Sequence, residues 1–568
     1  MPDPTAVTPS GALATLAERY WRFECQEMPL SAALAGAKLD DAVLFRESPL
    51  DHARRDARAG ELLVELQAID AGALAGQELA THRLLQRELG GIRAQYAVQA
   101  YLRPSIFPVA MDFSTVFWAN STAISNAADA ARYVERLASI PEGLRGFRES
   151  LAAGHAAGIR YPRVVLGAAV ANTNGMLGAA PEASAWFGPF KRSAVAGSEA
   201  LRPHAERALT FIADELQPAL REHAAFMAGP LADGARDTLT CTQGPHGKEL
   251  YCVLVQHFTT TPMAPEQVHT LGLAEVARIA GEIEAIAALA GYAGNVAGYR
   301  HFLATDPQFV APSAEVLRGQ IESLCKRIDR RIPAYFGHIP RITYGVESIP
   351  DGVSANMPPA YAQPSPPDGS APGIFWVNGL PAKCPSYLHP ALALHEAWPG
   401  HLMHLALLQE AQDLPTFRRH GAVKYTACVE GWALYCETLG IEMGMYETPH
   451  QRYGQLEMEM WRAVRMVVDT GIHLHDWSRE KAIACMSEHL TLSPETIAGE
   501  VDRYAALPAQ ALGYQIGNLA LRGLRKKAQA QLGERFSHRN FHTAVMTAGA
   551  VTLPVLEDLV GDWLSTQA

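Results

Sequence analysis

The sequence has no dense run of basic residues and no long apolar run. Its 48 lysines and arginines are outnumbered by 59 aspartates and glutamates, which gives a formal net charge of −11. A chain with this charge is poorly suited to binding a phosphate backbone, and the short basic run at 525–527 does not change that. No stretch approaches the roughly 18 consecutive apolar residues of a transmembrane helix. The sequence therefore predicts a protein that binds neither nucleic acid nor membranes.

Several common motifs are also missing. The eight cysteines never form a C-x-x-C pair, and the first residues, MPDPTAVTPSGALATLAERYWRFE, lack the basic and apolar segments of a secretory signal. We therefore expect reduced thiols in a cytoplasmic protein. There is no G-x-S-x-G elbow, no phosphate-binding loop and no dinucleotide-binding fingerprint, which argues against a serine α/β-hydrolase and a nucleotide-dependent enzyme.

Helical periodicity dominates what is present. The hydrophobic fraction of 48% and the charged fraction of 19% are typical of a globular protein. Apolar residues recur every three or four positions in four long segments: Ser198–Met227, Pro265–Tyr292, Gln451–Trp477 and the region around Ala53–Tyr96. The sequence predicts a mainly α fold, a large helical body with a substrate groove. It predicts one domain over 1–568, which could divide into a helical N-terminal lobe at about 1–340 and a metal-site lobe at about 341–568.

Strand signals are few. The segments RITYGVES (341–348) and GIFWVNG (373–379) are rich in β-branched and aromatic residues and predict two strands. Between them, 349–373 is rich in proline, glycine and serine, which indicates a long ordered loop or a domain linker. We favour the loop, because residues with metal-binding potential follow it directly. A small β-element beside a helical metal site could bind an extended peptide by strand addition.

The segment LHPALALHEAWPGHLMHLALL (388–408) carries His395, Glu396 and His401. A zincin places two histidines on one helix face as H-E-x-x-H, with the glutamate as general base. Here the spacing is H-E-x-x-x-x-H, and residues six apart on a regular helix point about 240° apart. Pro399 and Gly400 lie between them and predict a break that turns His401 toward His395. The metal site is therefore predicted to need an interrupted helix.

Two alternatives remain for these histidines. His401 could pair with His404, one turn away, and leave His395 aside; or all three could be ordinary core or surface residues. The following segment, YTACVEGWALYCETLG (425–440), favours a metal site because it places Glu430 and Glu437 on an apolar helix. A carboxylate there is costly unless it is paired or bound to a metal. Glu437 could hold a histidine N–H, and a solvated carboxylate is the alternative for both glutamates.

Further downstream, polar residues that could assist hydrolysis occur in apolar segments. Tyr514 in ALGYQIGN and His473 in DTGIHLHDW are candidate donors to an oxyanion. Packing is the alternative for Tyr514, and interaction with a helix dipole is the alternative for His473. Arg465 and Arg503 are candidates for binding a substrate carboxylate. For Arg465 the structural alternative, which we favour, is an ion pair with Asp469.

Taken in order, HEAWPGH, EGWALYCE, RAVRMVVDTGIH and PAQALGYQIG resemble the bacterial domain of unknown function 885 (DUF885). That family is similar in its core to gluzincin metallopeptidases such as the carboxypeptidase Taq and oligopeptidase groups. The resemblance covers most of the chain and implies a helical body, a zinc ion and hydrolytic activity. Residue by residue, it implies His395, His401 and Glu430 as metal ligands and Glu396 as general base. The chain reads PGHLMH where family members commonly read PGHHLQ, which leaves the role of His404 open.

The residues and the resemblance together predict a zinc-dependent hydrolase of peptide or peptide-like amide bonds. Metal-activated water would attack the amide, with Glu396 moving the proton. The expected partner is a small peptide or amide substrate, and a homodimer is left open. A zinc amidase of a non-peptide metabolite and a non-catalytic binding protein on a peptidase scaffold are the alternatives. A His/His/Glu set favours zinc over iron or manganese.

Overall fold

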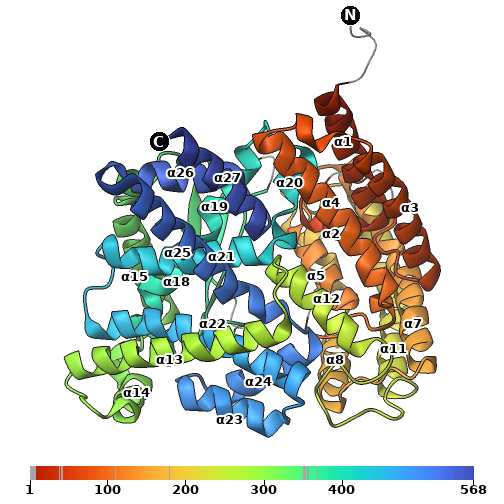
Figure 1. Cartoon of the computed structure of the whole chain (residues 1–568). Helices are drawn as coiled ribbons and strands as arrows, with labels where there is room; N and C mark the ends of the chain where they lie inside the picture. Colours follow the sequence, from red (N-terminus) through yellow and green to blue (C-terminus); the bar gives the residue numbers. More distant parts are fainter. Residues whose placement is uncertain are drawn as a thin grey trace, which may run out of the picture.

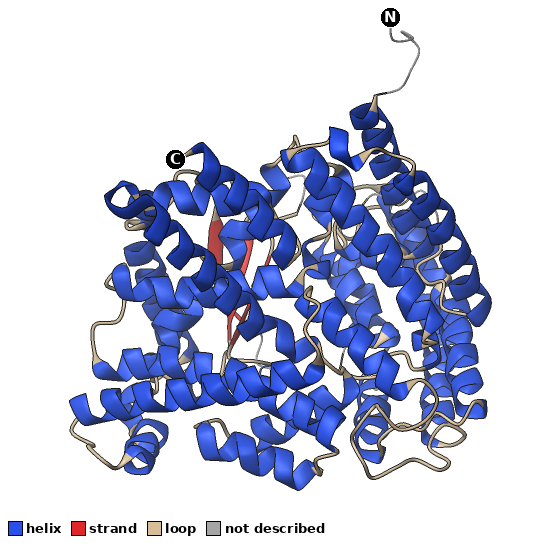
Figure 2. Cartoon of the chain, in the orientation of Figure 1, coloured by secondary structure: helices blue, strands red, loops and turns tan. Residues whose placement is uncertain are grey.

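The computed structural model describes residues 8–37, 39, 42–108, 110–177, 180–349, 354, 357–366 and 369–567. Helices account for most of these residues, and Figure 2 shows the short strands, in red, enclosed among them. The predicted mainly α fold with a small β-element is confirmed. Among the described residues, no helix is both long enough and apolar enough to cross a membrane.

The first helices form the right-hand side of the molecule in Figure 1, coloured red to yellow. They are α1 (Pro9–Glu27), α2 (Pro29–Leu34), α3 (Pro49–Gln67), α4 (Gly76–Ala97), α5 (Met111–Ser121), α6 (Ala127–Ala138), α7 (Ile140–Ala156), α8 (Arg163–Gly175), α9 (Gly188–Arg192), α10 (Arg202–Phe211) and α11 (Gln217–Ala228).

The second group of helices follows in the sequence. It comprises α12 (Gly247–Thr259), α13 (Pro265–Leu289), α14 (Val296–Thr305), α15 (Ala314–Asp329), α16 (Ile332–Tyr335), α18 (His389–Glu396), α19 (His401–Glu410), α20 (Thr416–His420), α21 (Thr426–Glu442), α22 (Pro449–His475), α23 (Arg479–His489), α24 (Pro494–Ala506), α25 (Gly513–Leu532), α26 (His538–Ala548) and α27 (Leu553–Thr566). Three of its members, α15, α18 and α19, pack on the sheet.

Three of the four predicted long helices form close to their predicted bounds. The segment predicted at 198–227 is helical from Arg202 to Ala228, with a π-helical turn at Ile212–Leu216. The region predicted as helical around Ala53–Tyr96 is helical, but it forms two separate helices, α3 and α4, which pack on each other. Between them, the carboxylate of Asp70 accepts a hydrogen bond from the N–H of Gly72 and caps a short 3₁₀ turn. An Asp two residues before a glycine is a typical turn former.

The described residues contain a three-stranded sheet in the order β1-β3-β2. β1 (Tyr344–Ser348) pairs parallel to β3 (Gly373–Val377), and both strands were predicted. β2 (Ala360–Gln363) pairs antiparallel to β3 and lies inside the segment predicted as loop. The loop prediction is wrong there, because the prolines on both sides of AYAQ do not prevent a short edge strand. Residues 350–353, 355, 356, 367 and 368 of that predicted loop lie outside the described residues.

The long helix α22 runs through the interior of the second group. Its N-terminus is capped by the side chain of Thr448, with Pro449 in the first turn. Residues 453–473 of this helix are all buried, and α13 packs along it (Figure 1). The largest hydrophobic cluster combines residues from α1 through α27. The single domain over 1–568 and its division into two lobes near residue 340 both stay predictions.

Candidate metal centre

The two histidines of the predicted motif belong to different helices. α18 ends at Glu396 and α19 begins at His401, so the predicted interruption is confirmed. A Cβ added to Gly400 would lie 1.9 Å from the carbonyl oxygen of His395, which no side chain tolerates. The indole N–H of Trp432, on α21, donates to the carbonyl of Pro399 at 2.9 Å. The break is therefore held by a close backbone approach and by a hydrogen bond from α21.

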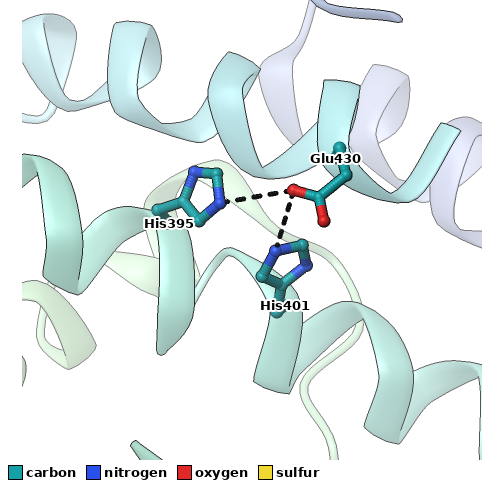
Figure 3. Close-up of side chains that lie close together, drawn as sticks. All are labelled: His395, His401 and Glu430. Carbon is teal, nitrogen blue, oxygen red and sulfur yellow. Dashed lines mark ion pairs between the residues drawn. The ribbon is translucent and has the colours of Figure 1, made fainter. Parts of the chain in front are cut away.

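This break brings three side chains together (Figure 3). Nε2 of His395 lies 3.5 Å from Oε2 of Glu430, and Nε2 of His401 lies 3.4 Å from the same oxygen. The two imidazole rings are nearly perpendicular, with centroids 4.8 Å apart. The three potential ligand atoms all lie within 4.8 Å of one another. Of the two pairings left open by the sequence, the structure forms the one between His395 and His401.

The spacing of this group matches the requirements of a small divalent cation. Two ligand atoms bound to zinc at tetrahedral angles are about 3.4 Å apart, given zinc–nitrogen and zinc–oxygen distances of about 2.0–2.2 Å. Both nitrogen–oxygen separations in this group agree with that value. Two imidazoles and one carboxylate are also a ligand set that zinc accepts. The residues present therefore fit a metal ion of this kind.

The surrounding charges favour a cation at the same position. Nδ1 of His395 is hydrogen-bonded to Oε1 of Glu437 at 2.7 Å, and Glu437 is completely buried. Burial lowers the pKa of His395, but Glu430 and Glu437 together raise it to about 9. Burial raises the pKa of Glu430, while the two imidazoles lower it well below its ordinary value. The histidine–carboxylate bond predicted for Glu437 is confirmed, and such a bond orients a ligand ring in known metal sites.

Glu396 and His404 lie on either side of this group in the sequence. Glu396 is buried, its charge acts on His395, and no hydrogen-bond partner of its carboxylate is found among the described residues. His404 is buried against Trp432, and burial lowers its pKa to about 3. Its ring is therefore a neutral part of the core near His401.

The helices that carry Glu430 and Tyr514, α21 and α25, pack backbone to backbone. A Cβ on Gly431 would lie 2.4 Å from the backbone of Gly517, so both positions require glycine. At this approach the charge of Glu430, on α21, acts on Tyr514, on α25. Burial raises the pKa of Tyr514, and the charge of Glu430 raises it further. The predicted oxyanion donor thus lies within the electrostatic range of one candidate ligand, Glu430, and its role stays a prediction.

Arg465 and Arg503 meet on one carboxylate that the sequence analysis missed. Arg465 donates to Glu500 at 3.0 Å, and Arg503 binds the same carboxylate through two nitrogens, each at 3.0 Å. The guanidinium of Arg465 lies over the ring of Tyr514 at 4.7 Å. Two arginines on one glutamate leave a net positive charge beside Tyr514. The i,i+3 spacing of Glu500 and Arg503 on α24 was the available sequence signal.

The predicted ion pair between Arg465 and Asp469 is wrong. The carboxylate of Asp469 instead accepts hydrogen bonds from the hydroxyl of Tyr251 at 2.7 Å and from the N–H of Ala509. It therefore ties α22 to α12 and to the segment before α25. The i,i+4 spacing allowed the pair, but packing of α24 supplied a nearer carboxylate for Arg465.

His473 lies on α22 with both ring nitrogens engaged by backbone groups. Nδ1 accepts from the N–H of Cys241, and Nε2 donates to the carbonyl of Tyr504, both at 3.0 Å. Burial lowers its pKa to about 4. This arrangement leaves no ring nitrogen for a substrate and favours a structural role over the predicted catalytic one.

Replacing Asp469 by asparagine is expected to shift the pH dependence of stability. Burial raises the pKa of Asp469 to about 7, above its unfolded value near 3.9. Because the folded state holds this proton more tightly, the free energy of unfolding of the wild type falls as pH rises through both values. The variant should gain about 2 kcal/mol relative to the wild type between pH 5 and pH 8, measured by urea unfolding. The exposed Asp562→Asn is the control, and an equal difference at both pH values would contradict the expectation.

Comparison with known proteins places the chain in a family. The model of a "Bacterial protein of unknown function (DUF885)" matches residues 29–560. The crystal structure of a "putative lipoprotein" from Colwellia psychrerythraea is similar at 26% identity and a TM-score of 0.91, covering 99% of this chain and 100% of that one. A "putative lipoprotein of unknown function" from Shewanella oneidensis shares the fold, at 18% identity and a TM-score of 0.71, covering 96% of this chain and 99% of that one. No curated protein matches the chain. The family model spans nearly the whole sequence, and the protein therefore belongs to the bacterial family DUF885.

Proposed function

We propose that this protein is a zinc-dependent hydrolase of peptide or peptide-like amide bonds, similar in chemistry to gluzincin metallopeptidases. The convergence of His395, His401 and Glu430 within 4.8 Å carries the proposal, with Glu396 directly following the first histidine. A protein that only binds ligands does not require the buried, unpartnered carboxylate of Glu396, whereas a hydrolase requires a general base there. The sequence motif and the three-dimensional group support the same site.

His395, His401 and Glu430 would hold the ion, and Glu437 would fix the ring of His395 through its Nδ1 proton. When bound, a zinc ion supplies Lewis acidity, which activates water and polarises a carbonyl group. Glu396 takes up the proton of the attacking water and passes it to the leaving amine. Its carboxylate suits this task because no protein donor among the described residues competes for it.

Tyr514 donates a hydrogen bond to the oxygen that becomes negative when the amide is attacked. Its raised pKa keeps the hydroxyl protonated at neutral pH, so it acts as a donor. Arg465, stacked on the Tyr514 ring, contributes positive charge to the same position. Nη1 of Arg465 is buried and has no hydrogen-bond partner among the described residues. We assign Arg465, together with Arg503, which binds the same Glu500, to binding a carboxylate of the substrate.

The cytoplasmic location stays a prediction. The similar structure from Colwellia psychrerythraea is described as a "putative lipoprotein", which favours a location outside the cytoplasm for this protein as well. The substrate class proposed above does not depend on this point.

Metal content and peptide cleavage test the proposal together. Purified wild-type protein should contain about one zinc per chain by elemental mass spectrometry, and His395→Ala and His401→Ala should each lose it. The exposed His301→Ala is the matched control and should keep the metal. A peptide library analysed by mass spectrometry should show cleavage by the wild type and by the control, and by neither of the two other variants. If the protein neither takes up added zinc nor cleaves a peptide, the proposed hydrolase is refuted. If it takes up zinc but cleaves no peptide, the proposed substrate changes to a non-peptide amide.

A further inference from the structure

A cavity of about 520 Å³ lies between the N-terminal helices and the segments that lead into the metal-site helices. Its walls come from α1, α2, α3, α4 and α12, from the segments around 100–105, 159–162, 420–424 and 505–508, and from Arg236 and Cys241. His395, His401 and Glu430 do not line it, so it is separate from the metal centre. Its volume is typical of sites for small organic molecules, which often lie between structural units.

Six lysine and arginine side chains line this cavity, and half of them are neutralised. The paired ones are Arg55 with Glu47, Arg87 with Glu88 and Lys424 with Glu24. Arg103, Arg160 and Arg236 make up the other half. Among the described residues, none of these three arginines forms an ion pair with a carboxylate, which leaves the cavity wall with surplus positive charge.

The three arginines are held in place by backbone carbonyls. Arg103 donates to the carbonyl of Cys241 at 2.7 Å, Arg236 to that of Arg160 at 2.8 Å, and Arg160 to that of His155 at 2.6 Å. Carbonyl oxygens orient a guanidinium but do not cancel its charge. Burial lowers the pKa of Arg236 to about 10, and the charge of Arg103 lowers it further, while Cys241 and Asp476 act in the opposite direction. An anion bound between them would relieve both the desolvation and the repulsion.

Aromatic rings form another part of the wall. Tyr96 and Tyr101 stack with centroids 5.3 Å apart, and His52 stacks on Tyr101 at 5.2 Å. Flat aromatic faces bind apolar or planar groups. Guanidinium groups that have no carboxylate partner within the protein bind the carboxylate of a ligand. The cavity therefore combines surfaces for both ends of an amphiphilic acid.

We propose that this cavity is a second ligand site, which binds a carboxylate-bearing organic molecule with an apolar or planar body. The carboxylate is bound by Arg103, Arg160 and Arg236, and the apolar body lies along the Tyr96–Tyr101 stack. The site does not depend on the metal centre. Its ligand is either a free organic acid or the acidic end of a peptide, because both present the same carboxylate.

Fluorescence titration of the full-length protein with two matched probes tests this inference. N-dansyl-glutamate carries two carboxylates, and N-dansyl-glutaminamide has the same body without charge. The acidic probe should bind at least about tenfold more tightly. Arg236→Gln and Arg103→Gln should each reduce that preference by about fivefold or more and leave the neutral probe unaffected. Equal affinity for the two probes would overturn the proposal.

Three controls test whether the probe binds in this cavity. Arg163→Gln removes an exposed arginine that already pairs with Asp237 and should leave binding unchanged. Arg236→Lys keeps the charge and should retain most of the preference, which excludes misfolding as the cause of the loss in Arg236→Gln. His395→Ala should bind the acidic probe as the wild type does, whatever its hydrolytic activity; loss of binding there would assign the probe to the metal centre and refute the second site. Competition with unlabelled glutarate or N-acetyl-Ala-Phe-Glu then identifies a free acid or a peptide as the better ligand, and displacement by neither would refute the site.

Discussion

Replacing Glu396 by glutamine is expected to slow hydrolysis strongly and leave metal binding intact. Glutamine has the shape of glutamate but cannot accept a proton from water, so kcat should fall by about 10²-fold to 10⁴-fold. Glu396 is not one of the three groups that converge on the candidate metal position. The metal content of the variant should therefore equal that of the wild type, and only the rate should change.

The comparison needs a glutamate whose replacement is neutral. Glu284 on α13 is exposed to solvent, and Glu284→Gln should retain the full rate. Initial rates on the best peptide from the library, with metal content measured on the same samples, distinguish a lost base from a lost ion. A Glu396→Gln variant that binds the metal and turns over at the wild-type rate would remove Glu396 from the mechanism.

Replacing Gly400 by alanine is expected to disrupt the break between α18 and α19. The added methyl group would lie 1.9 Å from the carbonyl oxygen of His395 and 2.5 Å from that of Leu394. Both contacts are with backbone, so the strain cannot be relieved by a side-chain rotation. The variant should lose at least about 3 kcal/mol of unfolding free energy, because overpacking against a fixed backbone forces the helices apart. His401 would move with α19, and zinc affinity should fall with stability.

Gly523 supplies the control for this experiment. It lies on the exposed side of α25, and a Cβ there would meet nothing within 4 Å. Gly523→Ala should increase stability by about 0.5–1 kcal/mol, since alanine favours the helix. Urea unfolding with and without added zinc measures both variants. A Gly400→Ala protein as stable as the wild type, with unchanged zinc stabilisation, would show that the break tolerates a side chain.

The candidate metal centre was predicted from the sequence as far as residue types allow. His395, Glu396 and His401 were identified by the motif, and the break by Pro399 and Gly400, because these two residues disfavour a continuous helix. The choice between a His395–His401 pair and a His401–His404 pair could not be made from spacing. It depends on the direction in which the chain leaves the break, which the Trp432 hydrogen bond and the Gly400 contact set in the folded protein.

The partners of Arg465 and His473 could not be predicted from sequence spacing either. Arg465 has Asp469 one turn away on its own helix, yet it pairs with Glu500 of another helix. His473 was interpreted as a possible donor, and its two nitrogens are bonded to the backbone of distant segments. Sequence spacing reports neighbours on one helix face, whereas these partners come from helices that are far apart in the chain.

By itself, the sequence determined the helical character of this protein, the strands at 344–348 and 373–377, and the residue types that could bind a metal. Periodic apolar positions and local breaks encode these features within a few residues of one another. Only the tertiary structure decided that Glu430 and both histidines meet in one group, that Gly431 and Gly517 bring the helices of Glu430 and Tyr514 together, and that three arginines held by backbone carbonyls line a separate cavity. The physical reason is that each of these features depends on how helices from distant parts of the chain pack together. That packing is determined by the surface they bury and by how closely their backbones approach, and not by the local sequence.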